Sequence, residues 1–184
     1  MIGSARREVD EVVQARTEVG EVQIGTEECF LHLVEGLADP DPKTRRLAIC
    51  GLAACGDARA VDHIIGALHD DDPELRQRAA MALGKIGDQR AAPALIAAAE
   101  AGDPALHRAA IAALGELGPI AIGVLERELS CSDPADRVRA VIALGETRDV
   151  AAVEPLTRAL DDTDPTVRAR AREALEKVRE SRVF

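Results

Sequence analysis

The chain has 184 residues, of which 47% are apolar and 30% charged, and this balance is typical of one globular domain with a sizeable core. Its 34 Ala, against two Phe and no Trp or Tyr, favour an all-α protein, because Ala is the best helix former and a poor strand former. The net charge of −10 has the wrong sign for binding phosphates, and no apolar run approaches the about 18 residues of a membrane span, so we expect neither nucleic acid nor membrane as a partner.

The N-terminal part of the chain has the weakest helical pattern. Residues 10–25 fall where the repeat described below would place a helix, but they are poor in helix formers, so we expect 1–26 to be a degenerate or partly disordered segment. This region lacks the apolar core of a secretion signal, which predicts a cytoplasmic protein. Residues 27–38 then carry Phe30, Leu33 and Leu37 at the spacing of an amphipathic helix.

An Asp-Pro pair next recurs at intervals of 31, 31, 30 and 31 residues. Asp is a favoured N-cap and Pro belongs at the first helical position, so each pair is predicted to begin a helix, which we call a first helix. Counted from the Asp, position +7 is always Ala and position +11 is always Leu, which gives this helix an apolar stripe. The five pairs are Asp41-Pro42, Asp72-Pro73, Asp103-Pro104, Asp133-Pro134 and Asp164-Pro165.

A second helix is predicted after each internal first helix. A dipeptide between the two helices combines a helix stop with the start of the next helix, as in Gly56-Asp57 and Gly87-Asp88. Gly118-Pro119 and Arg148-Asp149 are variants of this dipeptide. Apolar residues 11, 8 and 4 positions before the next Asp define the second helix, and residues 38–161 thus predict four complete helix pairs. In the final first helix, 164–182, Arg172 and Glu173 replace the apolar residues of positions +8 and +9, which predicts a charged C-terminal capping helix.

The sequence strings ALGKIGD (82–88) and AAPALI (91–96) resemble the HEAT-like repeat of the phycobilisome-lyase type. The resemblance covers residues 27–182 and implies an α-α superhelix, a HEAT-like α-solenoid of helix-pair repeats about 31 residues long. We therefore expect residues 27–184 to form one repeat domain. The resemblance also implies that the second helices line the concave face.

The repeat leaves few residues for chemistry, and we expect no catalytic residue, no metal and no cofactor. The four His are followed by Leu33, Ile64, Asp70 and Arg108, so the iron-binding His-Glu dipeptides of the deoxyhypusine hydroxylases, HEAT-like enzymes that this chain resembles in architecture, are missing. The expected function is a scaffold or adaptor that binds a partner protein. The alternative is a bilin lyase-like or other tetrapyrrole-handling subunit, which the repeat type suggests.

Position +4 of the first helices carries a regular row of side chains. We expect these residues to form a structural ladder with the turn acids of neighbouring units, Asp57, Asp88 and Asp149, and so to fix the register of the stack. The other interpretation is a basic row that binds an acidic partner. The row consists of Arg45, Arg76, His107, Arg137 and Arg168.

The candidate partner-binding surface lies on the predicted second helices, beside their core stripe. Aliphatic residues line up there next to two His, and an exposed apolar patch on a soluble protein often marks an interaction site. The candidates are His32, Val34, His63, Ile65, Ile96 and Val124.

The four Cys are expected to be free thiols, as is usual in the cytoplasm. Cys50 and Cys55 fall within a predicted helix, whereas Cys131 falls in the loop before Asp133. We therefore expect Cys131 to react first with a thiol reagent.

Overall fold

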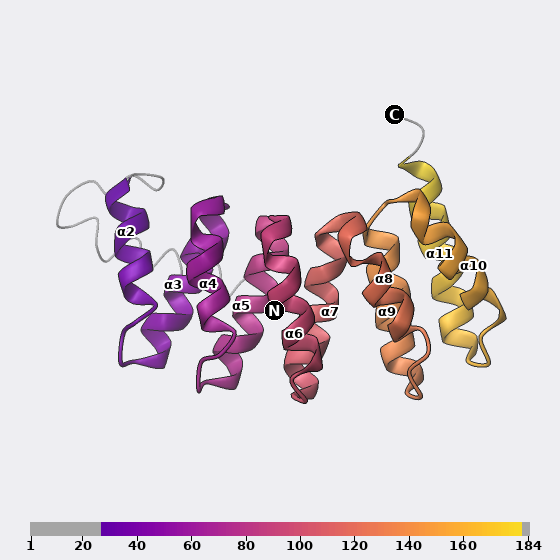
Figure 1. Cartoon of the computed structure of the whole chain (residues 1–184), viewed down its shortest axis with the longest axis horizontal. Helices are drawn as coiled ribbons and strands as arrows, with labels where there is room; N and C mark the ends of the chain where they lie inside the picture. The colour runs from indigo at the N-terminus through magenta and orange to yellow at the C-terminus, as the bar shows by residue number, and fades with distance from the viewer. Residues whose placement is uncertain (1–26, 182–184) are drawn as a thin grey trace.

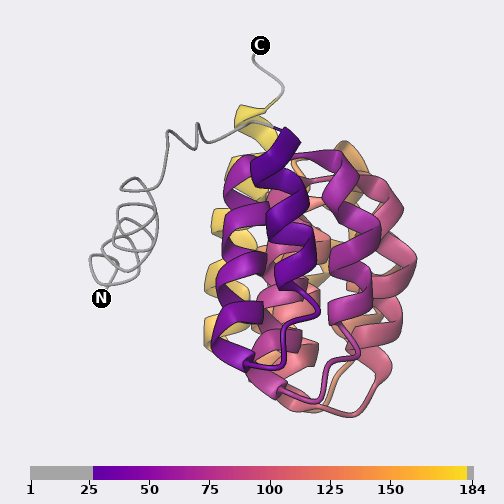
Figure 2. The same cartoon turned by 90° about the vertical axis from the view of Figure 1, so that its left-hand side faces the viewer.

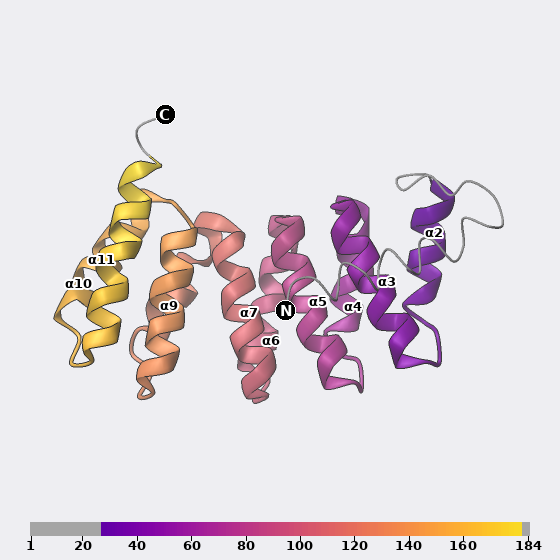
Figure 3. The ribbon, with the colours of Figure 1, turned by 180° about the vertical axis from the view of Figure 1, so that it is seen from behind.

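The computed structural model describes residues 27–181, in which paired α-helices stand side by side in a row of two layers (Figures 1 and 3). The first helices are α3 (Pro42–Cys55), α5 (Pro73–Ile86), α7 (Pro104–Glu116), α9 (Pro134–Glu146) and α11 (Pro165–Glu180). The other layer consists of α2 (Glu27–Gly36), α4 (Val61–Ala67), α6 (Ala92–Glu100), α8 (Ile122–Glu128) and α10 (Val153–Arg158). The four predicted helix pairs are confirmed, while the expected helix at 10–25 lies outside the described residues.

The predicted helix boundaries are confirmed by their capping geometry. Every first helix has an Asp N-cap whose side chain accepts a backbone N–H from the first turn, with Pro following it. At the other end, Gly56 and Gly87 adopt φ of 64° and 73°, and their N–H groups donate to the carbonyls of Leu52 and Leu83. Arg148 takes the same left-handed conformation, with φ of 51°.

The second helices begin with a short 3₁₀ turn that precedes the α-helix. The side chains of Asp57, Asp88 and Asp149 cap these turns by accepting the N–H two residues later. The 3₁₀ helices are Ala58–Ala60, Gln89–Ala91, Gly118–Ala121 and Val150–Ala152, and a further one, Ala159–Asp161, follows α10.

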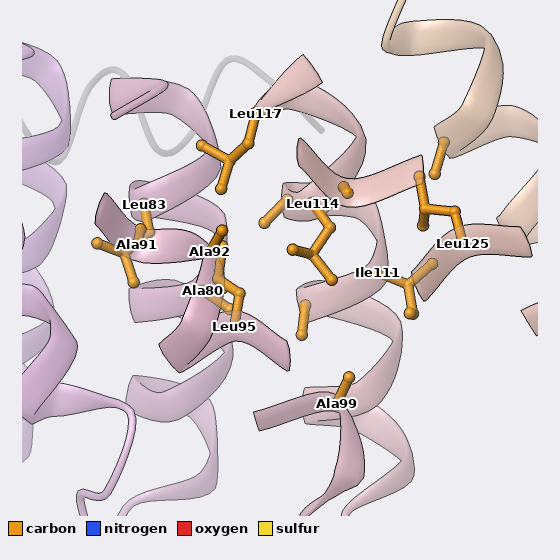
Figure 4. Packing of buried hydrophobic residues seen from close by; sticks show 14 of the residues in the cluster. Ala80, Leu83, Ala91, Ala92, Leu95, Ala99, Ile111, Leu114, Leu117 and Leu125 are labelled. Carbon is orange, nitrogen blue, oxygen red and sulfur yellow. The ribbon is translucent and has the colours of Figure 1, made fainter. Parts of the chain in front are cut away.

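The core lies between the two layers. Leu83 and Leu114 of the first helices and Leu95 and Leu125 of the second are fully buried, and Figure 4 shows them between the helices. Position +8 is buried in every internal first helix, whereas Arg172, which occupies it in α11, is exposed. Position +9 is expected to pack between units as position +8 does, but its large side chains face solvent. Met81 and Ile142 are exposed, and so is Glu173.

The first helices approach one another closely through small residues. A Cβ placed on Gly84 would lie 2.7 Å from the Cα of Ala113, and one on Gly115 would lie 2.8 Å from the Cα of Ala143. Likewise, a Cβ placed on Gly145 would lie 2.8 Å from the Cβ of Ala174 and 3.1 Å from its Cα. These glycines at position +12 are therefore required by helix packing.

The same contacts give the row its curvature. Each first helix packs closely against the next, whereas the backbones of successive second helices are more widely spaced and are linked by surface ion pairs such as Arg127–Glu100 and Arg158–Glu126. A two-layer stack bends toward its more closely spaced layer, so the first helices form the concave face. In the end-on view of Figure 2, α3 and α11 lie on one side and the middle of the row bulges toward the second helices. The expectation that the second helices line the concave face is wrong.

Candidate functional site

The Arg at position +4 connects one unit to the next. Nε and Nη2 of Arg137 each donate to a carboxylate oxygen of Asp162 at 2.8 Å, and Nη1 donates to the carbonyls of Cys131 and Ser132 at 2.9 and 3.0 Å. The hydrogen bond from Arg137 holds the pKa of Asp162 below its usual range. Only 11% of the Arg137 side chain and 13% of the Asp162 side chain are exposed, so this is a partly buried, bidentate pair.

The pattern recurs in other units. Arg45 forms two 2.9 Å hydrogen bonds with Asp70, and Arg76 forms one of 2.8 Å with Asp103, whose pKa it lowers. His107 replaces the Arg in the third unit, where Nδ1 lies 2.9 Å from the carbonyl of Ala99 and Nε2 lies 3.4 Å from Glu128. Arg168 donates to the carbonyls of Asp162 and Thr163, and within residues 27–181 it forms no ion pair with a carboxylate.

The acids in these pairs are not those expected. Asp70, Asp103 and Asp162 lie at the loop that leads into the next first helix, whereas the expected partners lie at the opposite end of the helix pair. Asp57 and Asp88 instead cap the second helices and pair with Arg59 and Arg90, which lowers their pKa values, and Asp149 caps the 3₁₀ helix Val150–Ala152.

The six second-helix candidates are only partly brought together. Val34, Ile65, Ile96 and Val124 are half-buried and pack against the core, while His32 and His63 are exposed. A hollow of about 270 Å³ lies between α2 and α4 and contains two of the candidates. Its lining residues are Val34, Leu37, Ala38, His63, Gly66, Ala67 and Asp70.

The concave layer carries a more exposed apolar row. Met81 is 63% and Ile142 is 42% exposed, and Ala112 of the intervening helix is also exposed, all at position +9. Leu47, which is 37% exposed, lies at position +6 of α3. Next to this row, positions +5 and +6 supply Arg46, Arg78, Arg108, Arg139 and Arg170. We call these nine residues the first-helix face. The apolar column at +9 is visible in the sequence, but the pattern alone predicts that it packs between units.

Two negative findings apply to the described residues alone. Within 27–181, no group of three or more His, Cys, Asp or Glu side chains is placed to hold a metal ion. Across the same residues, no helix combines the length and the apolar character needed to cross a membrane.

The reactivity of the thiols is expected to differ from the sequence-based order. Burial and the hydrogen bond that the Cys131 thiol donates to Glu128 at 3.3 Å raise the pKa of Cys131 to about 11. We expect Cys131 to react at least ~10-fold more slowly with iodoacetamide at pH 8 than an unperturbed cysteine, because the thiolate is the nucleophile. Peptide mass spectrometry of timed samples measures the rate. Glu128→Gln should accelerate Cys131, and a wild-type Cys131 that reacts first of the four would contradict the assignment.

Several solved structures have a fold similar to that of this chain. The complex of CpcE and CpcF of phycocyanin lyase from Nostoc sp. PCC7120 matches with a TM-score of 0.67 and 24% identity, over 88% of this chain and 69% of that chain. The archaeal HEAT-like repeats protein from Thermococcus onnurineus NA1 matches with a TM-score of 0.55 and 16% identity, over 84% of this chain and 72% of that chain. A designed armadillo repeat protein matches with a TM-score of 0.56 and 13% identity, over 94% and 86% of the two chains.

At these identities the structures show the shared fold and nothing about activity. No curated protein matches the sequence. The sequence profile of HEAT repeats matches residues 30–115 and 122–184, which together are more than half of the chain. With the stacked helix pairs observed between α2 and α11, this match shows that the chain belongs to the HEAT repeat family.

Proposed function

We propose that this protein is a non-catalytic scaffold or adaptor that binds a partner protein in the cytoplasm without a cofactor. The observation that supports this proposal is the exposed apolar row of Met81, Ala112 and Ile142 on the concave face. Exposed, aligned apolar side chains are typical of interaction surfaces, and stacked repeats offer them along an extended surface. The net charge of −10 favours a protein over nucleic acid or an anionic membrane as the partner.

The six second-helix residues stay proposed as a second contact surface, now on the convex side. Exposed His63 and half-buried Val34 share the hollow between α2 and α4, which has room for a side chain of a partner. Ile65 and Ile96 pack against the core, so an Asp at either position would weaken the fold together with any contact. Hydrogen exchange of the bound chain separates the two surfaces, since protection at α4 and α6 would indicate the convex one.

A tetrapyrrole-handling subunit remains the second candidate function. It is favoured by the similarity in fold to the phycocyanin lyase complex, a structure that itself contains two associated proteins. The chain has two Phe and no Trp or Tyr with which to stack on a pigment, and this composition favours the scaffold.

Two measurements on the full chain test the proposal. The tagged protein is used to capture partners from cells of its native source, and it is separately incubated with haem and with a linear bilin before its absorbance spectrum is recorded. We expect a stoichiometric protein partner and unshifted pigment spectra. A shifted pigment spectrum without a captured protein would support the tetrapyrrole function and overturn the scaffold.

A further inference from the structure

We propose that the first-helix face binds an acidic amphipathic helix of the partner protein, an inference that rests on the proposed function. Three features of the face lead to this occupant: its apolar row, the sign of the charges next to that row, and the spacing of the helices that carry both.

The apolar row follows a straight course across the middle of the molecule. Met81, Ala112 and Ile142 occupy the same position on α5, α7 and α9, which pack side by side in that order. The adjacent position, +8, is buried in each of these helices, so each exposed side chain lies next to a residue of the packed core. Such a row suits a partner that crosses the first helices and presents one apolar side chain to each.

On the side of positions +5 and +6 the charge next to the row is positive, although the protein as a whole is acidic. On the other side, position +13 is mixed, with Lys85, Glu116 and Glu146. Positions +5 and +6 of the five first helices hold five Arg and no Asp or Glu, in a chain with a net charge of −10. Side chains three or four residues apart on a helix are surface neighbours, so these Arg flank the position +9 row. A partner that covers the row must therefore place groups beside a line of guanidinium groups, and carboxylates complement them.

The guanidinium groups of this line differ in how free they are to bind a partner. Arg108, at the centre of the line, is exposed and has no ion-pair partner within residues 27–181. Arg78, Arg139 and Arg170 pair with acids of their own helices, Glu74, Asp136 and Glu173, and Arg46 pairs with Asp72 and Glu74. The pairs of Arg78 and Arg170 are about half exposed and contribute little energy, and a guanidinium has five donors, so a partner carboxylate can join or replace the acid there. Arg46 and Arg139 are more buried and less accessible.

The spacing of the row fits a helix. Packed helices lie about 8 to 10 Å apart, and an α-helix rises about 1.5 Å per residue, or about 10 Å in seven residues. A helix laid across α5, α7 and α9 thus offers residues i, i+7 and i+14 to Met81, Ala112 and Ile142. Its residues on the side of positions +5 and +6 then lie over the Arg line, where Glu or Asp would complete the contact.

The test uses the full chain and two synthetic peptides of 21 residues, each with three heptads. One peptide has Leu at the core positions of the heptads and Glu at the flanking positions, and the other has Lys in place of Glu. Fluorescence anisotropy at 50 mM salt measures the affinity of each labelled peptide. We expect the acidic peptide to bind at least tenfold more tightly than the basic one.

Matched variants locate the site. Arg108→Glu on α7 and Arg127→Glu on α8 change the charge equally at exposed residues of opposite layers, and only the first is expected to weaken acidic-peptide binding, by tenfold or more. Met81→Glu should also weaken it by tenfold or more. Ile120→Glu, at a similarly exposed apolar residue away from the face, should leave it unchanged. Circular dichroism melting confirms that each variant folds.

Several outcomes would overturn the proposal. Equal affinity for the two peptides, no binding of either, or equal effects of Arg108→Glu and Arg127→Glu would each do so. Binding that appears only after removal of residues 1–26 would assign the face to the chain's own N-terminal segment, and a dimer that Met81→Glu dissociates would assign it to a second copy. If Met81→Glu still captures the protein partner from cells, the scaffold function stands and this binding site is wrong.

Discussion

Gly115→Ala is expected to destabilise the protein by about 2 to 3 kcal/mol, although Ala is the better helix former. The new Cβ would lie 2.8 Å from both the Cα and the carbonyl oxygen of Ala143. These are backbone atoms of α9, so no side-chain rotation relieves the clash, and α7 and α9 must move apart. Urea unfolding followed by circular dichroism measures the change in the free energy of unfolding.

Gly123→Ala is the matched control, because its Cβ would meet no atom within 4 Å. Gly123 lies in α8, in the widely spaced layer, and the substitution should leave stability unchanged or raise it by about 0.5 to 1 kcal/mol. Equal losses in the two variants would show that the close approach of the first helices does not carry this stability.

Arg137→Ala is expected to lower the melting temperature by several degrees, whereas Arg168→Ala should lower it clearly less. Both side chains donate through Nη1 to two carbonyls of the loop before their own helix. Only Arg137 reaches a carboxylate at the loop into the next unit, and its removal leaves Asp162 without this charged donor. Thermal unfolding of the two variants measures the contribution of the connection between units.

Equal shifts in melting temperature for these two variants would contradict a role of the Arg–Asp pair in fixing the stack. The competing interpretation of the +4 row, a basic surface for a partner, predicts almost no shift for Arg137→Ala. A normal melting temperature with impaired partner capture would therefore support that interpretation.

The fold could be predicted because its signals are local. Asp-Pro starts, left-handed stops and the Ala and Leu columns each specify a boundary or a face within one helix, and all were confirmed in residues 27–181. The partners of the Arg row could have been predicted from helix geometry as well. Position +4 lies in the first turn of a helix, and Asp57 lies beyond the far end of that helix, about 18 Å away at 1.5 Å per residue.

The candidate surface was harder to predict, because it depends on how the two layers bend. Positions +8 and +9 are both apolar in internal units, and they differ by about 100° around the helix, so periodicity alone does not decide which one faces solvent. The curvature depends on contacts between units, such as that of Gly84 with Ala113, which no single helix specifies. Met81 and Ile142 therefore became candidates only once the neighbouring helices were in place.

The close contact of glycine with alanine also bears on how this chain can change in length. Position +12 of one first helix meets position +10 of the next, at Gly84 with Ala113 and again at Gly115 with Ala143. A duplicated unit of about 31 residues would carry both a Gly at position +12 and an Ala at position +10. It could therefore pack against the unit before it and the unit after it through the same Gly–Ala contact. Loss of part of a unit would separate the two positions. Gain or loss of whole repeats is thus a route of sequence change that this packing tolerates.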